Sequence, residues 1–93
     1  MRTLIYFTRE LPGIGAELSR AGCQVYEALA LSEVFYLAEQ HPDAAIVIDH
    51  SVDDEAAREV ARHHVTLRMT PDATVTNVVW ELSHLSTTKP ILH

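Results

Sequence analysis

The chain has 93 residues, of which 47% are apolar, and this is enough for one modest hydrophobic core in a single small domain. Thirteen acidic side chains against seven basic ones give a net charge of −6, which excludes a protein that binds nucleic-acid phosphates non-specifically. No apolar run is long enough to span a membrane, and the single cysteine, Cys23, cannot form an internal disulfide, so we expect a cytoplasmic protein.

Four short apolar segments predict β-strands, because they are rich in β-branched and aromatic residues. The third segment is the most apolar and shows no alternation, which is typical of a strand buried on both faces of a sheet. The predicted strands are Thr3–Phe7, Cys23–Ala28, Ala44–Asp49 and Val65–Met69.

Helices are predicted after each strand, where apolar residues recur three and four positions apart. Gly22 is suited to the C-terminal cap of the first helix, Ser32 to the N-cap of the second, and Pro42 ends that second helix. Residues Ser51–Asp54 fit a capping box that begins the third helix. Thr70–Asp72 predicts the start of the last helix, with proline in its first turn.

Strand and helix patterns therefore alternate four times with short loops, and parallel neighbours in a sheet require helical crossovers of this kind. We predict an α/β fold with a parallel sheet and helices on both of its faces. Residues 1–86 form the domain in this interpretation, and residues 87–93 form a C-terminal tail.

Two stretches in the middle of the chain resemble the receiver domain of two-component response regulators. Residues Ala21–Ala28 are similar to the receiver strand with the pattern G-x-x-V-x-x-A, and Leu37–Asp49 to the helix and strand that end in P-D-L-V-L-L-D. The resemblance places Asp49 at the phosphoacceptor position, at the carboxyl edge of the sheet, where open α/β proteins hold their sites. Leu67–Asp72 and the helix after it resemble the last strand, turn and helix of a receiver, so one strand–helix unit is absent. The resemblance implies a flavodoxin-like three-layer αβα sandwich around a four-stranded parallel sheet in the order 2-1-3-4.

Several residues that phosphorylation of a receiver requires are replaced in this chain. Thr8 and Arg9 stand where receivers carry an acidic pair that binds Mg²⁺, with Glu10 beside them. Thr70 replaces the lysine that precedes the proline. Without these groups a carboxylate lacks the cations that offset charge during phosphoryl transfer. We therefore predict neither a cofactor such as Mg²⁺ nor phosphorylation, and we interpret Asp49 as a solvated side chain that hydrogen-bonds the next turn.

A glycine pair after the first strand resembles part of a dinucleotide-binding loop. Gly13-Ile14-Gly15 opens a helix, and Glu27 ends the second strand as a ribose-binding acid would. Leu18, however, occupies the third glycine position, and the sheet is small for a dinucleotide. We interpret the glycines as a turn that enters a helix, with nucleotide binding as the alternative.

Six histidines are spread along the chain without a spacing typical of metal ligands. His41, His63 and His64 are predicted at helix C-termini, where imidazole side chains interact favourably with the helix dipole. His50 is adjacent to Asp49 at the predicted carboxyl edge. The alternative to a structural role for His50 is a weak acid–base or metal site that it forms with Asp49.

The last predicted helix carries polar residues and a tryptophan on the side opposite its apolar stripe. Asn77, Trp80 and His84 lie on this side, since a helix turns about 100° per residue. An exposed tryptophan beside polar groups is typical of a protein interface. The alternative is a tryptophan that packs under the tail residues Pro90–Leu92.

We expect a receiver-like module for protein–protein interaction or signalling that is not phosphorylated, and that forms a homodimer or binds a protein partner through Asn77, Trp80 and His84. Neither nucleic acid nor a membrane is an expected partner. The alternative is a small enzyme, or a ligand- or nucleotide-binding protein, that uses the carboxyl edge of the sheet around Asp49. The other candidate residues at this edge are Thr8, Glu10, His50 and Thr70.

Overall fold

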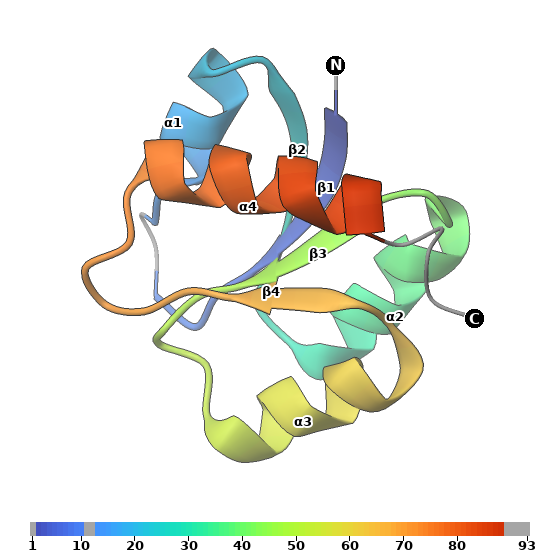
Figure 1. The fold of residues 1–93 in the computed structure, drawn as a ribbon. Coiled ribbons are helices and arrows are strands. Elements are labelled where there is room, and N and C mark those ends of the chain that lie inside the picture. The colour runs from blue at the N-terminus through green and yellow to red at the C-terminus, as the bar shows by residue number, and fades with distance from the viewer. Residues whose placement is uncertain (1, 11–12, 89–93) are drawn as a thin grey trace.

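The computed structural model describes residues 2–10 and 13–88, with side chains as far as residue 82. Strands and helices alternate along this part of the chain and form three layers, a central sheet with two helices on each side (Figure 1). The strands are β1 (Arg2–Phe7), β2 (Cys23–Ala28), β3 (Ala45–Ile48) and β4 (Thr66–Arg68). The helices are α1 (Gly15–Arg20), α2 (Leu31–Gln40), α3 (Asp54–His63) and α4 (Val75–Thr88).

The sheet has the predicted architecture of an α/β fold. Its order is β2-β1-β3-β4, and all neighbouring strands of this four-stranded sheet in the described part of the chain are parallel. β1 pairs with β2 from Arg2 opposite Cys23 to Phe7 opposite Ala28, whereas β4 pairs with β3 over only three residues. β1 and β3 therefore form the centre of the sheet, and β2 and β4 are its edges.

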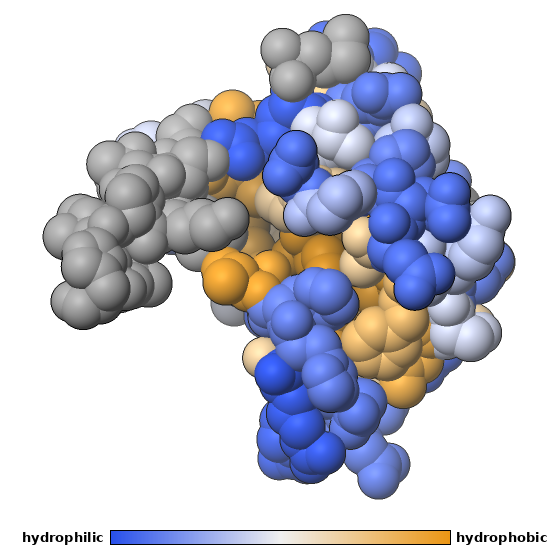
Figure 2. Space-filling model, turned by 90° about the vertical axis from the view of Figure 1, so that its right-hand side faces the viewer, coloured by the Kyte–Doolittle hydropathy of each residue, from blue (hydrophilic) through white to orange (hydrophobic). Residues whose placement is uncertain are grey.

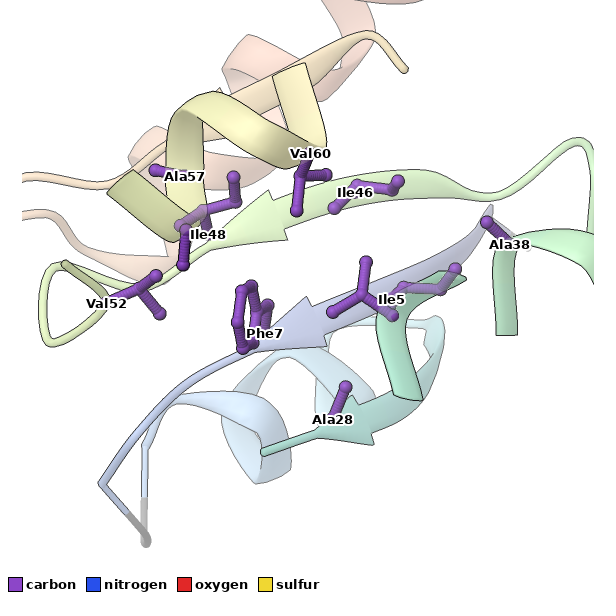
Figure 3. Close-up of a cluster of buried hydrophobic side chains, with 11 residues drawn as sticks. Ile5, Phe7, Ala28, Ala38, Ile46, Ile48, Val52, Ala57 and Val60 are labelled. Carbon is purple, nitrogen blue, oxygen red and sulfur yellow. The ribbon is translucent and has the colours of Figure 1, made fainter. Parts of the chain in front are cut away.

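Alternating residues of the central strands divide the core into two halves. Ile5 and Phe7 face α2 and α3, whereas Leu4 and Tyr6 face α1 and α4, and all four side chains are buried. The sheet is thus covered on both faces, which explains the continuous apolar run of β3. Around Ile5 and Phe7 pack Ala28, Val34, Ala38, Ile46, Ile48, Val52, Ala56, Ala57 and Val60 (Figure 3).

Helix α2 does not begin after Ser32 as predicted. At its N-terminal end a glutamate side chain, and not a serine, accepts backbone N–H groups. The helix begins at Leu31, so Ser32 lies inside it. The Glu33 carboxylate accepts hydrogen bonds from the N–H groups of Leu29 (2.8 Å) and Ala30 (3.1 Å). The prediction of Ser32 as the N-cap is therefore wrong.

Helix α3 is capped by Asp53 and not by the predicted Ser51. The Asp53 carboxylate accepts the N–H of Ala56 at 3.1 Å, as an N-cap residue does. The predicted C-terminal end of α1 is confirmed, since Gly22 follows that helix with a φ of 101°, in the left-handed region that glycine adopts without strain. Ser51 therefore does not cap α3, and its hydroxyl donates to Asp49 instead.

Helix α4 begins at Val75, later than the predicted start at Thr70–Asp72. The side chains of Thr74 and Asn77 each accept the backbone N–H of the other at 3.2 Å, which is a capping box. The helix continues to Thr88, beyond residue 86 where the predicted domain ends. Among the described helices, none has the length and apolar character that crossing a membrane requires.

Candidate functional site

Asp49 follows β3 directly and lies at the carboxyl edge of the sheet. Its N–H donates to the carbonyl oxygen of Phe7 at 2.8 Å, which extends the pairing between β3 and β1. The residue is only 5% exposed. The interpretation of Asp49 as a solvated side chain is therefore wrong, because residues at the ends of two adjacent strands enclose it.

Three hydroxyl groups lie within hydrogen-bond distance of the carboxylate of Asp49. Tyr6 Oη donates to Oδ1 at 2.8 Å, and Ser51 Oγ donates to Oδ2 at 2.6 Å. The N–H of Ser51 and the hydroxyl of Thr8 each lie 3.1 Å from Oδ2. Thr8 has a single proton and alternatively donates to the carbonyl oxygen of Glu10 at 2.9 Å. Donors from β1 and from the turn after β3 thus hold this carboxylate, and we call these side chains the Asp49 network.

These contacts fix the charges in the Asp49 network. Burial raises the pKa of Asp49, but the hydrogen bonds from Ser51, Tyr6 and Thr8 outweigh burial and bring the pKa below its ordinary value. Burial, followed by the hydrogen bond to Asp49, raises the pKa of Tyr6 to about 12. At neutral pH Asp49 is therefore an anion and Tyr6 a neutral donor. A carboxylate stabilised in this way is a weaker base and nucleophile than a free one.

Two side chains that can carry positive charge lie beside this network. Nδ1 of His50 is 3.6 Å from Oδ1 of Asp49, which is an ion-pair distance when the imidazole is protonated. Adjacent residues of a strand point to opposite faces, but β3 ends at Ile48, so the side chains of Asp49 and His50 can approach each other. Arg9 turns away instead: its guanidinium donates to the carbonyl oxygen of Leu29 at 3.0 Å and lies 3.4 Å from a carboxylate oxygen of Asp53.

A pocket of about 290 Å³ opens at the carboxyl edge of the sheet. Glu10, Asp49 and His50 line it, so the structure brings these three predicted edge residues together. Thr8 is buried behind the carboxylate, and Thr70 is exposed and donates to the carboxylate two residues later at 2.8 Å. The remaining lining residues are Tyr6, Gly13, Ile14, Glu17, Met69, Pro71 and Ala73.

The metal chemistry of a receiver has no counterpart in the described residues. Among them, no group of three or more histidine, cysteine, aspartate or glutamate side chains is placed to bind a metal ion. At the two positions of the receiver's acidic pair, Thr8 donates to Asp49 and Arg9 pairs with Asp53. This arrangement stabilises a buried anion and leaves Asp49 without the ligand set for Mg²⁺.

Tyr6 and Ser51 are members of the network that the sequence analysis missed. Tyr6 stands in the middle of an apolar strand, and a buried tyrosine hydroxyl usually requires a hydrogen-bond partner. Ser51 stands two residues after Asp49, which is the spacing of a turn in which an aspartate accepts a backbone N–H. The tyrosine in an apolar strand and the spacing of Ser51 from Asp49 are both visible in the sequence. The strand register that aligns Tyr6 with the end of β3 is not.

The two glycines after β1 are explained by packing against neighbouring side chains. A Cβ at Gly13 would collide with the Tyr6 ring, and the next N–H, that of Ile14, donates to Tyr6 Oη at 3.3 Å. A Cβ at Gly15 would meet the Glu27 carboxylate. An anion at this end of α1 repels phosphate, and the helix has only six residues, so we do not propose nucleotide binding here.

Three of the histidines lie away from the Asp49 network, on the side of the molecule at the C-terminal ends of α2 and α3. His41 and His64 follow α2 and α3 as C-caps, as predicted, and His63 is the last residue of α3. This side is at the right of Figure 1, and Figure 2 shows hydrophobic surface there between hydrophilic regions. The His41 ring stacks on Tyr26, with centroids 4.2 Å apart. A pocket of about 500 Å³ on this side is lined by Phe35, Ala38, Glu39, His63 and His64.

Two of the three predicted interface residues, Asn77 and Trp80, border a groove between β4 and α4. Trp80 is 57% exposed, and Asn77 is exposed but also part of the capping box of α4. The side chain of His84 and the residues Pro90–Leu92 lie outside the part of the chain that the structure describes. The groove has a volume of about 630 Å³ and is lined by Leu67, Arg68, Met69, Thr70, Ala73, Thr76, Asn77, Val78, Trp80 and Glu81.

The raised pKa of Tyr6 predicts a loss of stability at alkaline pH. The unfolded chain releases the tyrosine proton at about pH 10, whereas the folded protein holds it to about pH 12. The contribution of the protonated Tyr6 hydroxyl to the free energy of unfolding is therefore complete below the unfolded-state pKa. It is lost as pH rises through the folded-state pKa. Urea titrations between about pH 8 and 11 should therefore show a steeper loss of unfolding free energy for the wild type than for Tyr6→Phe. Equal slopes for the two proteins would contradict the burial of this hydroxyl.

Comparison of the chain with protein-family models, with curated protein sequences and with solved structures found no match. The fold itself is established by the strand order and by the alternation of strands and helices. Helices α1 and α4 cover one face of the sheet, and α2 and α3 cover the other (Figure 1). The protein therefore contains a small α/β domain with four parallel strands in the order 2-1-3-4, consistent with flavodoxin-like and receiver-like folds.

Proposed function

We propose that this protein is a receiver-like interaction module in signalling, which binds a second protein or a second copy of itself through the groove between β4 and α4 and is not phosphorylated. The observation that carries the proposal is the groove itself, about 630 Å³ in volume and bordered by a tryptophan that is 57% exposed. Tryptophan side chains at such positions contribute strongly to protein interfaces.

The state of Asp49 supports the second half of this proposal. Phosphoryl transfer to a carboxylate needs an oxygen free to attack and cations that neutralise the transferred group. Here Oδ2 accepts from the Ser51 hydroxyl at 2.6 Å, and Oδ1 accepts from Tyr6 at 2.8 Å. The neighbouring guanidinium, that of Arg9, is bound to Asp53. Asp49 is therefore best understood as a structural anion.

Replacement of Trp80 tests the interaction surface. We expect wild-type protein to associate with itself in sedimentation experiments over a concentration series, and Trp80→Ala to raise the dissociation constant by at least about tenfold. The matched control is Tyr36→Ala, which removes an aromatic side chain of similar exposure, 62%, from α2 on the other face of the sheet. A protein that is monomeric throughout and shows the fluorescence of a buried indole would contradict the proposal.

Incubation with Mg²⁺ and acetyl phosphate, or with beryllofluoride, tests the absence of phosphorylation. The expected mass is unchanged, and the amide NMR signals of Ser51 and its neighbours stay in place. A covalent phosphate on Asp49 would contradict the proposal. The charge in the network explains the expected result, because the low pKa of Asp49 reflects hydrogen bonds that phosphorylation would break.

A second candidate function is supported by the pocket at the carboxyl edge. This pocket of about 290 Å³ places Glu10, Asp49 and His50 around one space, which is suitable for a small ligand or for a weak acid–base reaction. Large NMR shifts around these three residues in the beryllofluoride experiment would contradict the interaction module without phosphorylation and favour a functional site at this edge.

A further inference from the structure

Strand β4 is an edge of the sheet whose outer side carries hydrogen-bonding groups. The N–H of Met69 donates to the carbonyl oxygen of Ile48 on β3 at 2.8 Å. Backbone groups alternate in direction along a strand, so Leu67 also faces β3, and the N–H and C=O groups of Thr66 and Arg68 face outward. An edge of this kind is a template for pairing with another strand.

The arginine on this edge does not block it. Charged side chains that extend across an edge strand normally prevent edge-to-edge pairing. Arg68, however, is directed toward α3, where its guanidinium pairs with Asp54 at 2.6 Å and donates to the carbonyl oxygen of Val52 at 3.1 Å. The outward backbone groups of β4 are therefore not covered by this side chain.

The side chains of this segment alternate in polarity about Leu67. Leu67 and Met69 pack on the face toward α4. Val65 precedes β4, and the alternation of a strand directs it to the same side. Val65 is 63% exposed, and Trp80, which is 57% exposed, borders the groove that Leu67 and Met69 line. Thr66 and Arg68 point to the other face. The order apolar, polar, apolar, polar, apolar is the same when it is read in either direction.

We infer that two copies of the chain pair through β4 in antiparallel orientation, with Leu67 on the two-fold axis. This inference rests on the proposed interaction surface and specifies its partner as a second copy. Thr66 of each copy then lies opposite Arg68 of the other copy, and these are the residues whose backbone groups face outward. They form the hydrogen-bonded pairs, and Leu67 faces Leu67 of the other copy in a closer, non-hydrogen-bonded pair.

The same register matches side chains on both faces of the joined sheet. Val65 of one copy lies beside Met69 of the other, so apolar residues are paired on this face. On the opposite face each Arg68 meets Thr66, and its charge is already balanced by Asp54 of its own chain. The pairing joins two four-stranded sheets into one continuous sheet across the axis.

A proline substitution on each edge tests which strand forms the contact. Thr66→Pro removes one outward N–H from β4, and an edge strand tolerates this without loss of its inner hydrogen bonds. Glu27→Pro is the matched control: the carbonyl oxygen of Ala28 accepts the N–H of Thr8 at 3.0 Å, so Glu27 faces outward on the other edge strand. We expect Thr66→Pro to weaken self-association by at least about tenfold and Glu27→Pro to leave it unchanged.

A cysteine at the axis tests the register and does not depend on how well a proline variant folds. In a Cys23→Ala background, Leu67→Cys should form a disulfide-linked dimer on mild oxidation, because the two sulfurs face each other across the axis. Val65→Cys is the control, since Val65 lies opposite Met69 in this register and should crosslink far less. Preferential crosslinking of Val65→Cys would overturn the proposed axis.

The outcomes separate this inference from the proposed function. Loss of association in Trp80→Ala with full association in Thr66→Pro would overturn the strand pairing and leave the interaction surface in place. Equal loss in Thr66→Pro and Glu27→Pro would also overturn it, as would a wild-type protein that is monomeric at every concentration. Selective loss in Thr66→Pro together with crosslinking of Leu67→Cys would establish it.

Discussion

Replacement of Asp49 by alanine is expected to lower the free energy of unfolding by about 3 kcal/mol, because it leaves several buried donors without an acceptor. Tyr6 Oη and Ser51 Oγ donate to this carboxylate at 2.8 and 2.6 Å, and the N–H of Ser51 lies 3.1 Å away. Asp49→Asn keeps the volume of the side chain and one acceptor, and we expect it to cost about half as much. Urea or guanidinium unfolding at neutral pH measures both values.

The control for Asp49→Ala is Asp43→Ala, which removes an exposed carboxylate and should change the free energy of unfolding by less than about 0.5 kcal/mol. The pH dependence has a definite sign. The folded-state pKa of Asp49 lies below its unfolded value, so its contribution is complete above about pH 4 and is lost as pH falls through the folded-state pKa. An Asp49→Ala variant as stable as the wild type would contradict the stabilising role of the Asp49 network.

Replacement of Phe7 by alanine is expected to have the other large effect, a loss of about 4 kcal/mol of unfolding free energy. Phe7 is fully buried at the centre of the core half between the sheet and helices α2 and α3 (Figure 3). The cavity would lie between two helices and the central strand, where the neighbouring side chains have little freedom to fill it. Small domains have total stabilities of about 5–15 kcal/mol, so the variant should be close to unfolding at 25 °C.

Thermal and chemical unfolding followed by circular dichroism measure the effect of Phe7→Ala. Phe7→Leu is the matched variant, since it keeps most of the apolar volume, and it should cost less than about 1.5 kcal/mol. Phe35→Ala removes a half-buried ring outside this cluster and should have an intermediate effect. Similar losses for Phe7→Ala and Phe35→Ala would mean that the described packing around β1 is wrong.

The parallel sheet was accessible from the residue pattern because it depends on a few strong signals, and the strand order came from the resemblance to receiver domains. The uninterrupted apolar run before Asp49 predicts a central strand, and helical patterns between strands impose parallel pairing. Helix starts were less accessible, because several residues near each end can accept the same N–H groups. Glu33, Asp53 and Thr74 are used, and each competes with another polar residue within a few positions.

The candidate site was predictable in its position and not in its composition. Asp49 could be placed at the carboxyl edge because it ends the most apolar segment of the chain. Its burial could not, since burial depends on how far β1 extends beside β3 and on where the Tyr6 ring points. The register that pairs Tyr6 with Val47 brings the Tyr6 hydroxyl to Asp49, and no local pattern encodes that register.

The long sequence separations in the Asp49 network have a consequence for how the protein opens. Tyr6 and Asp49 are 43 positions apart, and Thr8 and Asp49 are 41 apart, so none of these hydrogen bonds forms until β1 and β3 have paired. Local fraying of a helix or a loop leaves the network closed. The backbone hydrogen of Asp49, which donates to the carbonyl oxygen of Phe7, therefore exchanges with solvent only when β1 and β3 separate, and its exchange rate reports the global stability of the domain.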